Sequence, residues 1–410
     1  MSVYDILKER GFIEQATHEE EVKEMLENEK VKFYIGFDPT ADSLHVGHFI
    51  QIIVMKHMQN AGHIPIALVG GGTAKVGDPS GRTDMRKMLK NNTLDENAES
   101  IGKQISKYLI LDGEKGILEN NAKWLDNLNY IDFLRDIGSK FSVNRMLEAE
   151  CFKSRLKSGL SFLEFNYMIM QGYDFLELNR RHDCKLQLGG NDQWSNIIAG
   201  ANLIRKVDRK SAYGLTFTLL TTSAGKKMGK TEKGALWIDK EKTSPFELFQ
   251  YFRNVSDEDV EKVLKLLTFL PLDEIEKLVN VEGNEINKAK EVLAYEFTKI
   301  VHGKDEADKA LEASKALFGK GENKDNVPSS EFDESLFEND GYQIRKILAD
   351  IGICATLSEG KRLIQSGGVY LNDERVKEFF ASISLDDFND NELMLRKGKK
   401  VYHKIIVKNK

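Results

Sequence analysis

Two histidines stand three positions apart in the stretch PTADSLHVGH, directly after a strand-forming run. His45 and His48 could share one helix face and ligate a metal such as zinc. They could instead open a helix whose free N–H groups and positive dipole end attract phosphate, with Gly47 admitting a nucleotide close to the backbone. A third zinc ligand is missing nearby, because His57 and His63 lack the H-E-x-x-H context. The pattern therefore favours nucleotide binding.

Two further segments carry cations that suit phosphate chemistry. KKMGKT presents Lys227 and Lys230 beside a glycine, as mobile charges that could stabilise a departing pyrophosphate. GDPSGRTDMRK offers Arg82 and Arg86 on a stretch rich in Gly, Pro and Ser that could close over phosphates. Taken singly, each segment also fits a solvated surface loop.

Polar residues recur on one face of an apolar helical stretch, FLEFNYMIMQGYDFLEL. Tyr167, Gln171 and Asp174 are spaced four and three residues apart, so their side chains share a face. Polar groups among apolar ones are unfavourable unless they have partners. A buried structural network would supply partners, and so would a ligand. The three residues together favour a lined pocket.

A glycine pair and an acidic residue follow another strand-like run, in LGGNDQW. Gly189 and Gly190 allow a ligand close to the backbone, and Asp192 could accept hydrogen bonds from ribose hydroxyls. The alternative is a helix N-cap at Asn191 or Asp192. The segment is thus a second candidate for nucleotide contact.

Short apolar runs precede these polar segments and alternate with helical stretches. The runs are KFYIGF (32–37), IPIALVG (64–70), KLQLG (185–189) and LTFTLL (215–220). They are typical of buried parallel strands in a doubly wound sheet, where ligands bind beyond the carboxyl ends of the strands. Residues 1–220 are therefore predicted to form a Rossmann-like α/β catalytic domain.

The remaining chain divides into three parts by composition. Residues 221–318 begin with the lysine loop and continue with helix-period segments, which predicts an α-helical domain. Residues 319–341 are polar, with Gly, Pro and Ser, and are predicted to be a linker. Residues 342–410 contain two short helical segments and a strand entered through Gly367 and Gly368, which predicts a small α+β module.

Composition limits the class of protein. With 41% apolar and 30% charged residues among 410, the chain fits a globular protein, and no apolar run is long enough to cross a membrane. The N-terminus lacks the basic start and apolar core of an export signal. Cys151, Cys184 and Cys354 are scattered without a C-x-x-C, which argues against structural zinc and favours a cytoplasmic location.

The formal net charge of −6 is unevenly spread. Residues 341–410 hold 13 Lys and Arg against 9 Asp and Glu, so the rest of the chain carries −10. A basic tail on an acidic body indicates that a polyanion would be bound locally, although a solvated basic C-terminus has the same composition.

These motifs resemble a known family. HVGH and KMGKT resemble the two signatures of class I aminoacyl-tRNA synthetases, H-I-G-H and K-M-S-K-S, in that order and about 180 residues apart. GFDPTADSLHVGH, ALVGGGTAKVGDPSGR, YMIMQGYDFLEL and LGGNDQWSNI resemble the bacterial-type tyrosyl-tRNA synthetases in order and spacing. The chain departs from the general second signature at Gly229 and Thr231, where that signature has serine.

The resemblance implies a two-step reaction. The tyrosine carboxylate attacks the α-phosphorus of ATP, pyrophosphate leaves, and the terminal adenosine of tRNA(Tyr) then takes the tyrosine. ATP enters as a substrate with Mg²⁺, and neither a protein-bound metal nor an organic cofactor is implied. The expected partners are tRNA(Tyr), tyrosine, ATP and a second copy of the chain in a homodimer, and no membrane.

The resemblance also implies roles for individual residues. Tyr34 and Asp174 would bind the phenol of tyrosine, and the whole substrate-binding set is Tyr34, Asp38, Asp78, Tyr167, Gln171, Asp174 and Gln193. ATP would be bound by His45, Gly47, His48, Gly190, Asp192 and Lys230. The residues expected to stabilise the transition state are Thr40, His45, His48, Arg82, Arg86, Lys227, Lys230 and Thr231.

The C-terminal module resembles the RNA-binding fold shared with ribosomal small-subunit protein four. Its two short helices would carry Arg345, Lys346, Lys361 and Arg362 as phosphate contacts. A small packing domain is the alternative. For the whole chain, three other functions remain open at this point: a tryptophanyl synthetase, a small-molecule nucleotidyltransferase and a non-catalytic RNA-binding protein.

Overall fold

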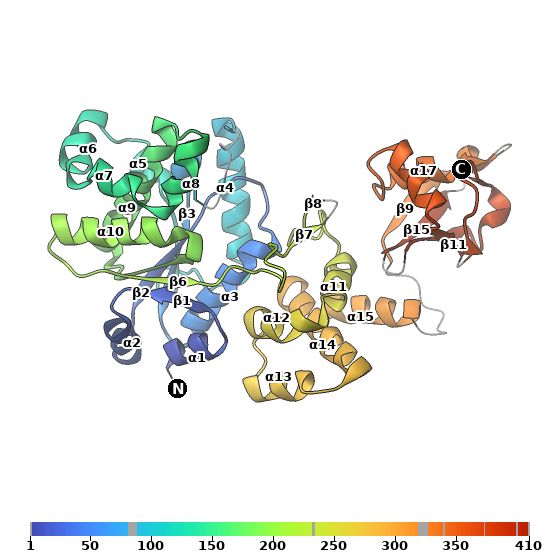
Figure 1. The fold of residues 1–410 in the computed structure, drawn as a ribbon, viewed down its shortest axis with the longest axis horizontal. Helices are drawn as coiled ribbons and strands as arrows, with labels where there is room; N and C mark the ends of the chain where they lie inside the picture. Colours follow the sequence, from blue (N-terminus) through green and yellow to red (C-terminus); the bar gives the residue numbers. More distant parts are fainter. Residues whose placement is uncertain are drawn as a thin grey trace. The chain divides into compact units, whose positions relative to one another are not determined.

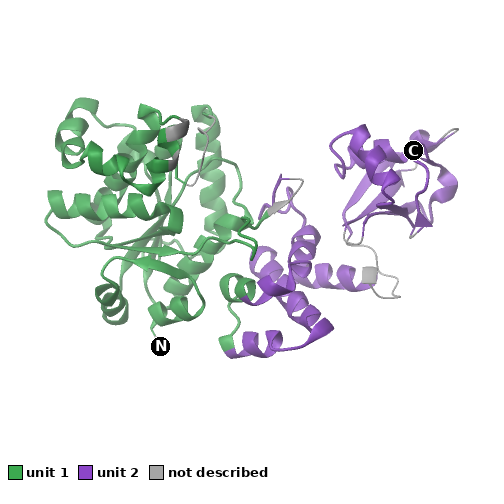
Figure 2. Cartoon of the chain, in the orientation of Figure 1, with its two compact units in different colours: residues 1–229, 262–272 green, residues 230–261, 273–410 purple. Residues whose placement is uncertain are grey.

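The computed structural model describes residues 2–80, 88–231, 234–318, 327–338, 341–372, 374–398 and 401–408. Its contacts divide the chain into two compact units (Figures 1 and 2). Unit 1 is Met1–Gly229 with Lys262–Leu272, and unit 2 is Lys230–Glu261 with Asp273–Lys410. None of the helices in these described ranges has the length and apolar character needed to span a membrane.

Unit 1 is built on a six-stranded sheet with the order β1-β6-β5-β2-β3-β4. The strands are β1 (Ile13–Ala16), β2 (Lys32–Phe37), β3 (Ile64–Val69), β4 (Ile117–Asn120), β5 (Leu186–Gly190) and β6 (Tyr213–Phe217). All neighbouring pairs are parallel except β1 with β6. The predicted doubly wound α/β fold is confirmed, with an antiparallel edge strand added. Every residue of β3 is buried, which explains its continuous apolar sequence.

The order of the strands reverses between β2 and β5. From β2 the chain proceeds outward through β3 and β4, whereas β5 and β6 lie on the other side of β2. Helices α9 (Phe162–His182) and α10 (Trp194–Val207) cover one side of this sheet, and α3 (Val46–Asn60) lies on the other (Figure 1). Such a reversal leaves a crevice at the carboxyl ends of the strands, where ligands bind in open α/β sheets.

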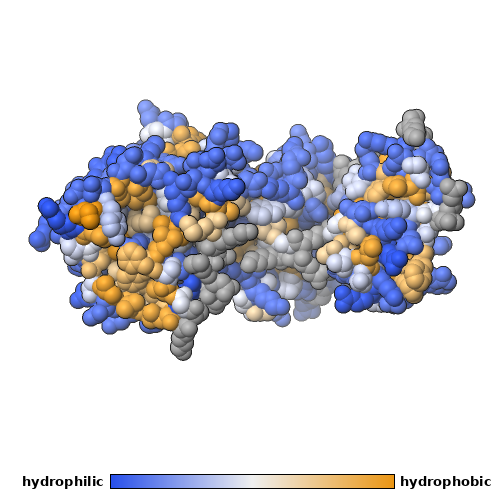
Figure 3. All heavy atoms as spheres, turned by 90° about the horizontal axis from the view of Figure 1, so that it is seen from above, coloured by the Kyte–Doolittle hydropathy of each residue, from blue (hydrophilic) through white to orange (hydrophobic). Residues whose placement is uncertain are grey.

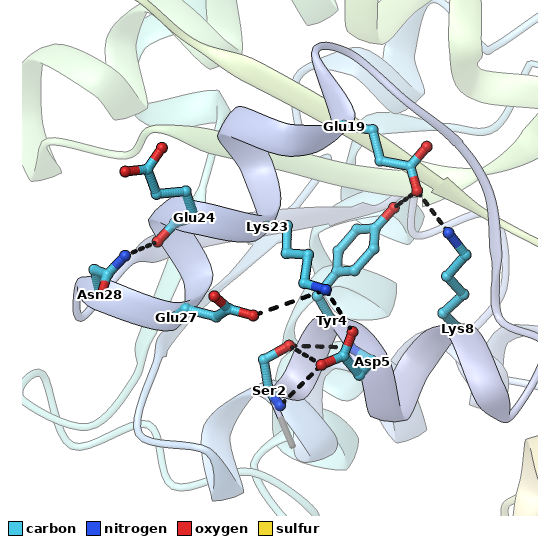
Figure 4. Close-up of polar contacts among 9 residues, drawn as sticks. All are labelled: Ser2, Tyr4, Asp5, Lys8, Glu19, Lys23, Glu24, Glu27 and Asn28. Carbon is cyan, nitrogen blue, oxygen red and sulfur yellow. Dashed lines mark hydrogen bonds and ion pairs between the residues drawn. The ribbon is translucent and has the colours of Figure 1, made fainter.

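Two helices at the N-terminus are joined by polar contacts, which Figure 4 shows. In α1 (Val3–Glu9), the Tyr4 hydroxyl donates a hydrogen bond to Glu19 Oε1 at 2.8 Å, and Lys8 Nζ pairs with the same oxygen at 2.8 Å. Glu19 opens α2 (Glu19–Asn28), and Lys23 of α2 pairs with Asp5 at 3.1 Å. These contacts fix the segment that leads into β2.

Hydrogen bonds from Arg10 connect the segment 262–272 to the rest of unit 1. This buried guanidinium donates to the carbonyls of Lys265 at 2.9 Å, Thr268 at 2.5 Å and Leu270 at 2.9 Å, at the end of α12 (Val260–Leu267). A cation at the C-terminal end of a helix is favoured by the helix dipole. Burial lowers the pKa of Arg10 to about 10.

Unit 2 contains a helical part and a C-terminal α+β module. The helices are α11 (Pro245–Arg253), α13 (Leu272–Val279), α14 (Ile286–His302) and α15 (Lys304–Phe318). The module has helices α16 (Ile344–Asp350) and α17 (Leu357–Gln365) and a five-stranded sheet of β12 (Glu374–Arg375), β11 (Val369–Leu371), β14 (Glu392–Lys397), β15 (Val401–Lys408) and β9 (Ser329–Asp333). Its own core includes Ile347, Leu348, Ile364, Leu393 and Ile405.

Candidate active site

Asp174 of α9 is a buried carboxyl group with two fixed donors. Its Oδ1 accepts from Trp124 Nε1 at 2.8 Å, and its Oδ2 accepts from Asn121 Nδ2 at 2.9 Å. Burial raises the pKa of Asp174 to about 8, against the lowering effect of these two hydrogen bonds. Each carboxylate oxygen has a second lone pair, so Asp174 can accept one more hydrogen bond.

The Tyr34 hydroxyl lies within electrostatic range of Asp174, and both side chains are buried. Tyr34 is on β2, and its ring packs against Phe175 with the centroids 5.3 Å apart. Its hydroxyl is buried and has no hydrogen-bond partner among the described residues. Burial, and secondarily the charge of Asp174, raises the pKa of Tyr34 above its usual value. A buried hydroxyl without a partner is unfavourable, and a ligand with a polar group at this point would supply one.

A chain of hydrogen bonds connects Asp174 to the end of β2. Asn121 also donates to the Thr73 hydroxyl at 2.9 Å, and Thr73 donates to Asp38 Oδ1 at 2.9 Å. The other oxygen of Asp38 accepts from the Tyr167 hydroxyl at 2.9 Å. Four of the predicted substrate residues, Tyr34, Asp38, Tyr167 and Asp174, are therefore brought together.

Three side chains that orient this group were not predicted from the sequence: Thr73, Asn121 and Trp124. Thr73 follows β3, and Asn121 follows β4, at the same edge of the sheet as Asp38. Thr73 could have been recognised as a polar residue after a predicted strand. The strand before Asn121 was not predicted, because ILEN is short and half polar.

Asp78 and Gln193 meet although they are far apart in the chain. Gln193 Nε2 donates to Asp78 Oδ2 at 2.8 Å, and Asn196 Nδ2 donates to Gln193 Oε1 at 3.1 Å. The backbone N–H of Ser80 donates to Asp78 Oδ1 at 2.9 Å. Gln171, the remaining substrate candidate, is half-buried on α9.

Asp192 lies within electrostatic range of Asp78 and Lys227. Burial raises the pKa of Asp192, the negative charge of Asp78 adds to the rise, and the positive charge of Lys227 opposes it. Asp192 belongs to a short turn before α10, and the N-cap of that helix is Gln193, without a side-chain capping bond. The alternative that Asn191 or Asp192 caps this helix is wrong. A Cβ at Gly190 would lie 2.8 Å from Leu219 Cδ2 and 2.9 Å from Asp192 Oδ1, so a larger residue there would have to displace these two side chains.

The two signature histidines stack on each other at the start of α3. The ring centroids of His45 and His48 are 3.8 Å apart with an angle of 16° between the planes, and His45 is the N-cap residue. A Cβ at Gly47 would lie 2.9 Å from His45 Cε1, so glycine lets the imidazole fold over the helix start. The nitrogen lone pairs of two stacked rings lie in nearly parallel planes and do not converge on one point. This arrangement does not suit two ligands of the same metal ion. Within the described part of the chain, no three His, Cys, Asp or Glu side chains form a metal-binding group.

The base of the lysine loop packs against this helix start. The Met228 N–H donates to the Leu220 carbonyl at 2.9 Å, and Met228 is buried. Gly229 has a positive φ of 77°, and a Cβ there would lie 3.0 Å from Val46 Cβ. The departure from serine at position 229 therefore has a physical reason, because only glycine adopts this conformation without strain.

Helix α12 contacts the base of the loop. Lys262 Nζ donates to the Thr221 carbonyl at 3.1 Å and to its hydroxyl at 3.2 Å, and Thr221 forms a β-bridge with Lys227. Lys227 is exposed, as is Thr40, whose N–H donates to the Asp38 carbonyl at 2.8 Å. The part of the loop up to Gly229 and the histidine turn are thus neighbours in unit 1.

Four candidates are not placed by the structure. Arg82 and Arg86 lie outside the described residues. The backbone of Lys230 and Thr231 forms β7 (Lys230–Thr231), but their side chains are outside the description.

The four module residues lie on the two predicted helices. Arg345 and Lys346 are on α16, and Lys361 and Arg362 are on α17. Lys346 and Arg362 are exposed, whereas Arg345 and Lys361 are half-buried.

Comparison with known proteins gives consistent matches along the chain. The family model "tRNA synthetases class I (W and Y)" matches residues 26–319, and "Tyrosine--tRNA ligase SYY-like C-terminal domain" matches residues 321–405. The "Tyrosine--tRNA ligase" of Clostridium kluyveri is 60% identical over 407 residues, covering 99% of this chain and 100% of that protein. The enzyme of the same name from Caldanaerobacter subterraneus is 60% identical over 408 residues, covering 100% of both chains.

A solved structure agrees with these matches. The C-terminally truncated mitochondrial tyrosyl-tRNA synthetase of Aspergillus nidulans superposes with a TM-score of 0.70 at 32% identity, covering 77% of this chain and 94% of that one.

Proposed function

The chain belongs to the class I tRNA synthetases of the tryptophan and tyrosine family, and from this premise we propose which residues carry its reaction. Its activity is that of a tyrosine–tRNA ligase, which uses ATP to join tyrosine to tRNA. No protein nucleophile is needed for this chemistry, because positioning and charge stabilisation can carry both steps.

The observation that supports the tyrosine site best is the buried pair Tyr34 and Asp174. A phenol placed between them would donate to a free lone pair of Asp174 and accept from the Tyr34 hydroxyl, which has no partner among the described residues. Phenylalanine would leave both groups unsatisfied. Tyrosyl-tRNA synthetases are themselves the standard example of rejecting an analogue that lacks a hydroxyl.

The amino and carboxyl groups of the substrate would lie toward the ends of β2 and β5. Asp38, Asp78 and Tyr167 supply oxygen acceptors for the ammonium, together with the half-buried Gln171. Gln193, held by Asn196 and Asp78, would contact the carboxylate. The carboxylate would then face the nucleotide side of the site for in-line attack.

The histidine turn and the glycine pair would bind ATP, which enters with Mg²⁺ on its phosphates. His45 and His48 would face the phosphates, and Gly47 would let the purine or ribose lie close to the backbone. Gly190 and Asp192 would contact the ribose. Lys230 would contact both ATP and the leaving pyrophosphate. Other cations and hydroxyls would stabilise the pyrophosphate as it separates: Thr40, Arg82, Arg86, Lys227 and Thr231.

The C-terminal module would bind the tRNA through phosphate contacts. Its helices α16 and α17 present Arg345, Lys346, Lys361 and Arg362. The chain would therefore act as three domains and a linker. They are the catalytic domain (1–220), the signature and helical domain (221–318), the linker (319–341) and the module (342–410).

We also propose that the enzyme is a homodimer. Helices α6 (Tyr130–Asp136), α7 (Val143–Leu147), α8 (Glu150–Ser158) and the start of α9 expose large apolar side chains: Tyr130, Ile131, Val143, Leu156, Phe162 and Leu163. Figure 3 views the molecule from the side where α6 and α7 lie in Figure 1, and apolar side chains gather there. A second copy would cover this patch, and sedimentation of the purified chain tests for it.

The location that we propose is cytoplasmic. The cysteines Cys151, Cys184 and Cys354 are free and buried, as expected for a protein in a reducing compartment.

The experiment that tests the activity is ATP–pyrophosphate exchange with each amino acid in turn, followed by charging of tRNA. We expect exchange with tyrosine and no comparable exchange with tryptophan or phenylalanine. Exchange with another amino acid would reassign the substrate, and no exchange with any amino acid would contradict the proposed site.

A further inference from the structure

Two adjacent phenylalanines form an aromatic surface on the C-terminal module. Phe380 is 58% exposed, and its ring centroid is 4.0 Å from that of Phe379. Lys361 Nζ lies 4.3 Å from the centroid of Phe379, and Arg345 Cζ lies 5.2 Å from the centroid of Phe380. We call these four residues the aromatic platform. A large exposed ring is unfavourable in water, and a partner that covered it would remove this cost.

The module holds the platform in place through its backbone. A Cβ at Gly360 would lie 3.2 Å from the Arg345 carbonyl oxygen, so this glycine lets α17 approach α16 closely. Lys361 is the next residue after Gly360, and it lies over Phe379 while Arg345 lies over the neighbouring Phe380. The turn that carries the phenylalanines is tied to the start of α16, because the Ile344 N–H donates to the Ala381 carbonyl at 3.0 Å. The platform is therefore largely formed before a partner binds.

The chemistry of the platform fits an unpaired nucleotide. Proteins that bind single-stranded nucleic acid combine cations that contact the backbone with aromatic rings on which bases stack. Arg345 covers part of the Phe380 ring, and the exposed remainder is open to a base. Arg345 and Lys361 keep donors for the neighbouring phosphates, and the exposed Lys346 and Arg362 extend the positive charge.

We propose that the aromatic platform stacks an unpaired base of the tRNA on Phe380, while Arg345 and Lys361 contact the flanking phosphates. The inference rests on the proposed function, because it takes tRNA as the partner of the module. It adds a contact that requires an exposed base. The phosphate contacts proposed for α16 and α17 have no such requirement. Paired RNA hides its base faces within the helix, so the platform would distinguish loops or ends from duplex.

Binding of three RNA probes to the full-length chain tests this proposal: the cognate tRNA, a single-stranded oligouridine and a blunt-ended duplex of the same length. Phe380→Ala should weaken binding of the tRNA and the oligouridine by roughly tenfold and leave duplex binding unchanged. Phe380→Trp should bind as the native chain does. Phe380→Leu keeps an apolar side chain but loses the ring, and it should resemble Phe380→Ala.

A matched control separates stacking from general loss of apolar surface. Leu385, 37% exposed in the same module, can be changed to alanine, and this variant should bind all three probes normally. The salt dependence adds a readout that a structural effect would not produce. Phe380→Ala should leave the slope of affinity against salt unchanged, whereas Arg345→Ala should reduce it by roughly one ion.

Several results would overturn the proposal. One is native affinity of Phe380→Ala or Phe380→Leu for the tRNA and the oligouridine. Another is that Phe380→Ala weakens binding of the duplex as much as binding of the other two probes. Altered sedimentation of Phe380→Ala with unchanged RNA affinity would make the platform a protein contact and would also overturn it. If the native chain charges tRNA while Phe380→Ala binds normally, only this inference fails. If the native chain does not charge tRNA, the proposed function fails.

Discussion

The proposed tyrosine site around Asp174 in unit 1 and the aromatic platform of the C-terminal module would recognise their partners in opposite ways. Asn121 and Trp124 donate hydrogen bonds to the buried carboxyl group of Asp174, whereas the buried Tyr34 hydroxyl has no partner in the part of the chain that the structure describes. On the module the rings and cations are exposed or half-buried. Buried polar groups discriminate between substrates because a wrong substrate leaves some of them without a hydrogen bond. Exposed cations, in contrast, attract any polyanion in proportion to its charge. Changes in the first region should therefore alter substrate choice, and changes in the second should alter affinity for RNA.

Deleting residues 341–410 should give the largest difference between the two activities, ATP–pyrophosphate exchange and charging of tRNA. Every residue assigned to tyrosine or ATP lies before Glu232, so exchange should stay near the native level while charging of tRNA is abolished. Both half-reactions should be measured on one preparation whose folding has been verified. Near-native charging would mean that the acidic body of the chain binds the tRNA without the module.

Replacing Lys230 by alanine should slow adenylate formation by roughly a hundredfold or more and change tyrosine affinity little, because its charge is needed as pyrophosphate separates. Pre-steady-state kinetics distinguishes the two quantities. Lys226, an exposed lysine of the same loop, provides the control, and Lys226→Ala should have a small effect. Loss of tyrosine binding in Lys230→Ala would give that lysine a ground-state role.

Gly229→Ala should impair adenylate formation by roughly tenfold, because the added methyl group strains the backbone and presses on Val46 at the start of α3. Gly225→Ala is a matched control in the same loop. Gly225 has a similar φ of 75°, but a Cβ there would meet nothing within 4 Å. Equal rates in the two variants would show that backbone strain alone matters and that contact with the histidine helix does not.

The buried carboxyl of Asp174 should make stability depend on pH. Its folded pKa, raised to about 8, exceeds the ordinary value of 3.8, so between these values the folded state keeps a proton that the unfolded state releases. The free energy of unfolding should therefore fall as pH rises from about 4 to about 8, by at most about 1.4 kcal/mol per pH unit. Urea unfolding at several pH values, compared with Asp174→Asn, isolates this contribution. An identical pH dependence in the two proteins would contradict the raised pKa.

The sequence predicted the elements of this site better than its supporting contacts. β3 is apolar throughout because every one of its residues is buried, and β2 and β5 are mostly buried, so the ends of these strands and the polar residues after them could be located. Asn121 and Trp124 follow β4, a short strand at the edge of the sheet with a weak pattern. Their role depends on packing against α9, and local periodicity carries no information about that contact.

Two other features needed three-dimensional information. Gly229 differed from the general signature, and its positive φ supplies the reason. Phe379 and Phe380 are an apolar pair in the sequence, and only their exposure and the cations on their rings distinguish them from a buried pair.

The most direct test of the account is the ratio of kcat/KM for tyrosine to that for phenylalanine in ATP–pyrophosphate exchange. Tyr34→Phe and Asp174→Asn should each lower this ratio by roughly ten- to a hundredfold, because each removes a hydrogen bond that only tyrosine can form. Tyr173→Phe, the same change beside Asp174 on α9, should leave the ratio unchanged. Native ratios in both Tyr34→Phe and Asp174→Asn would contradict the claim that this buried pair selects tyrosine.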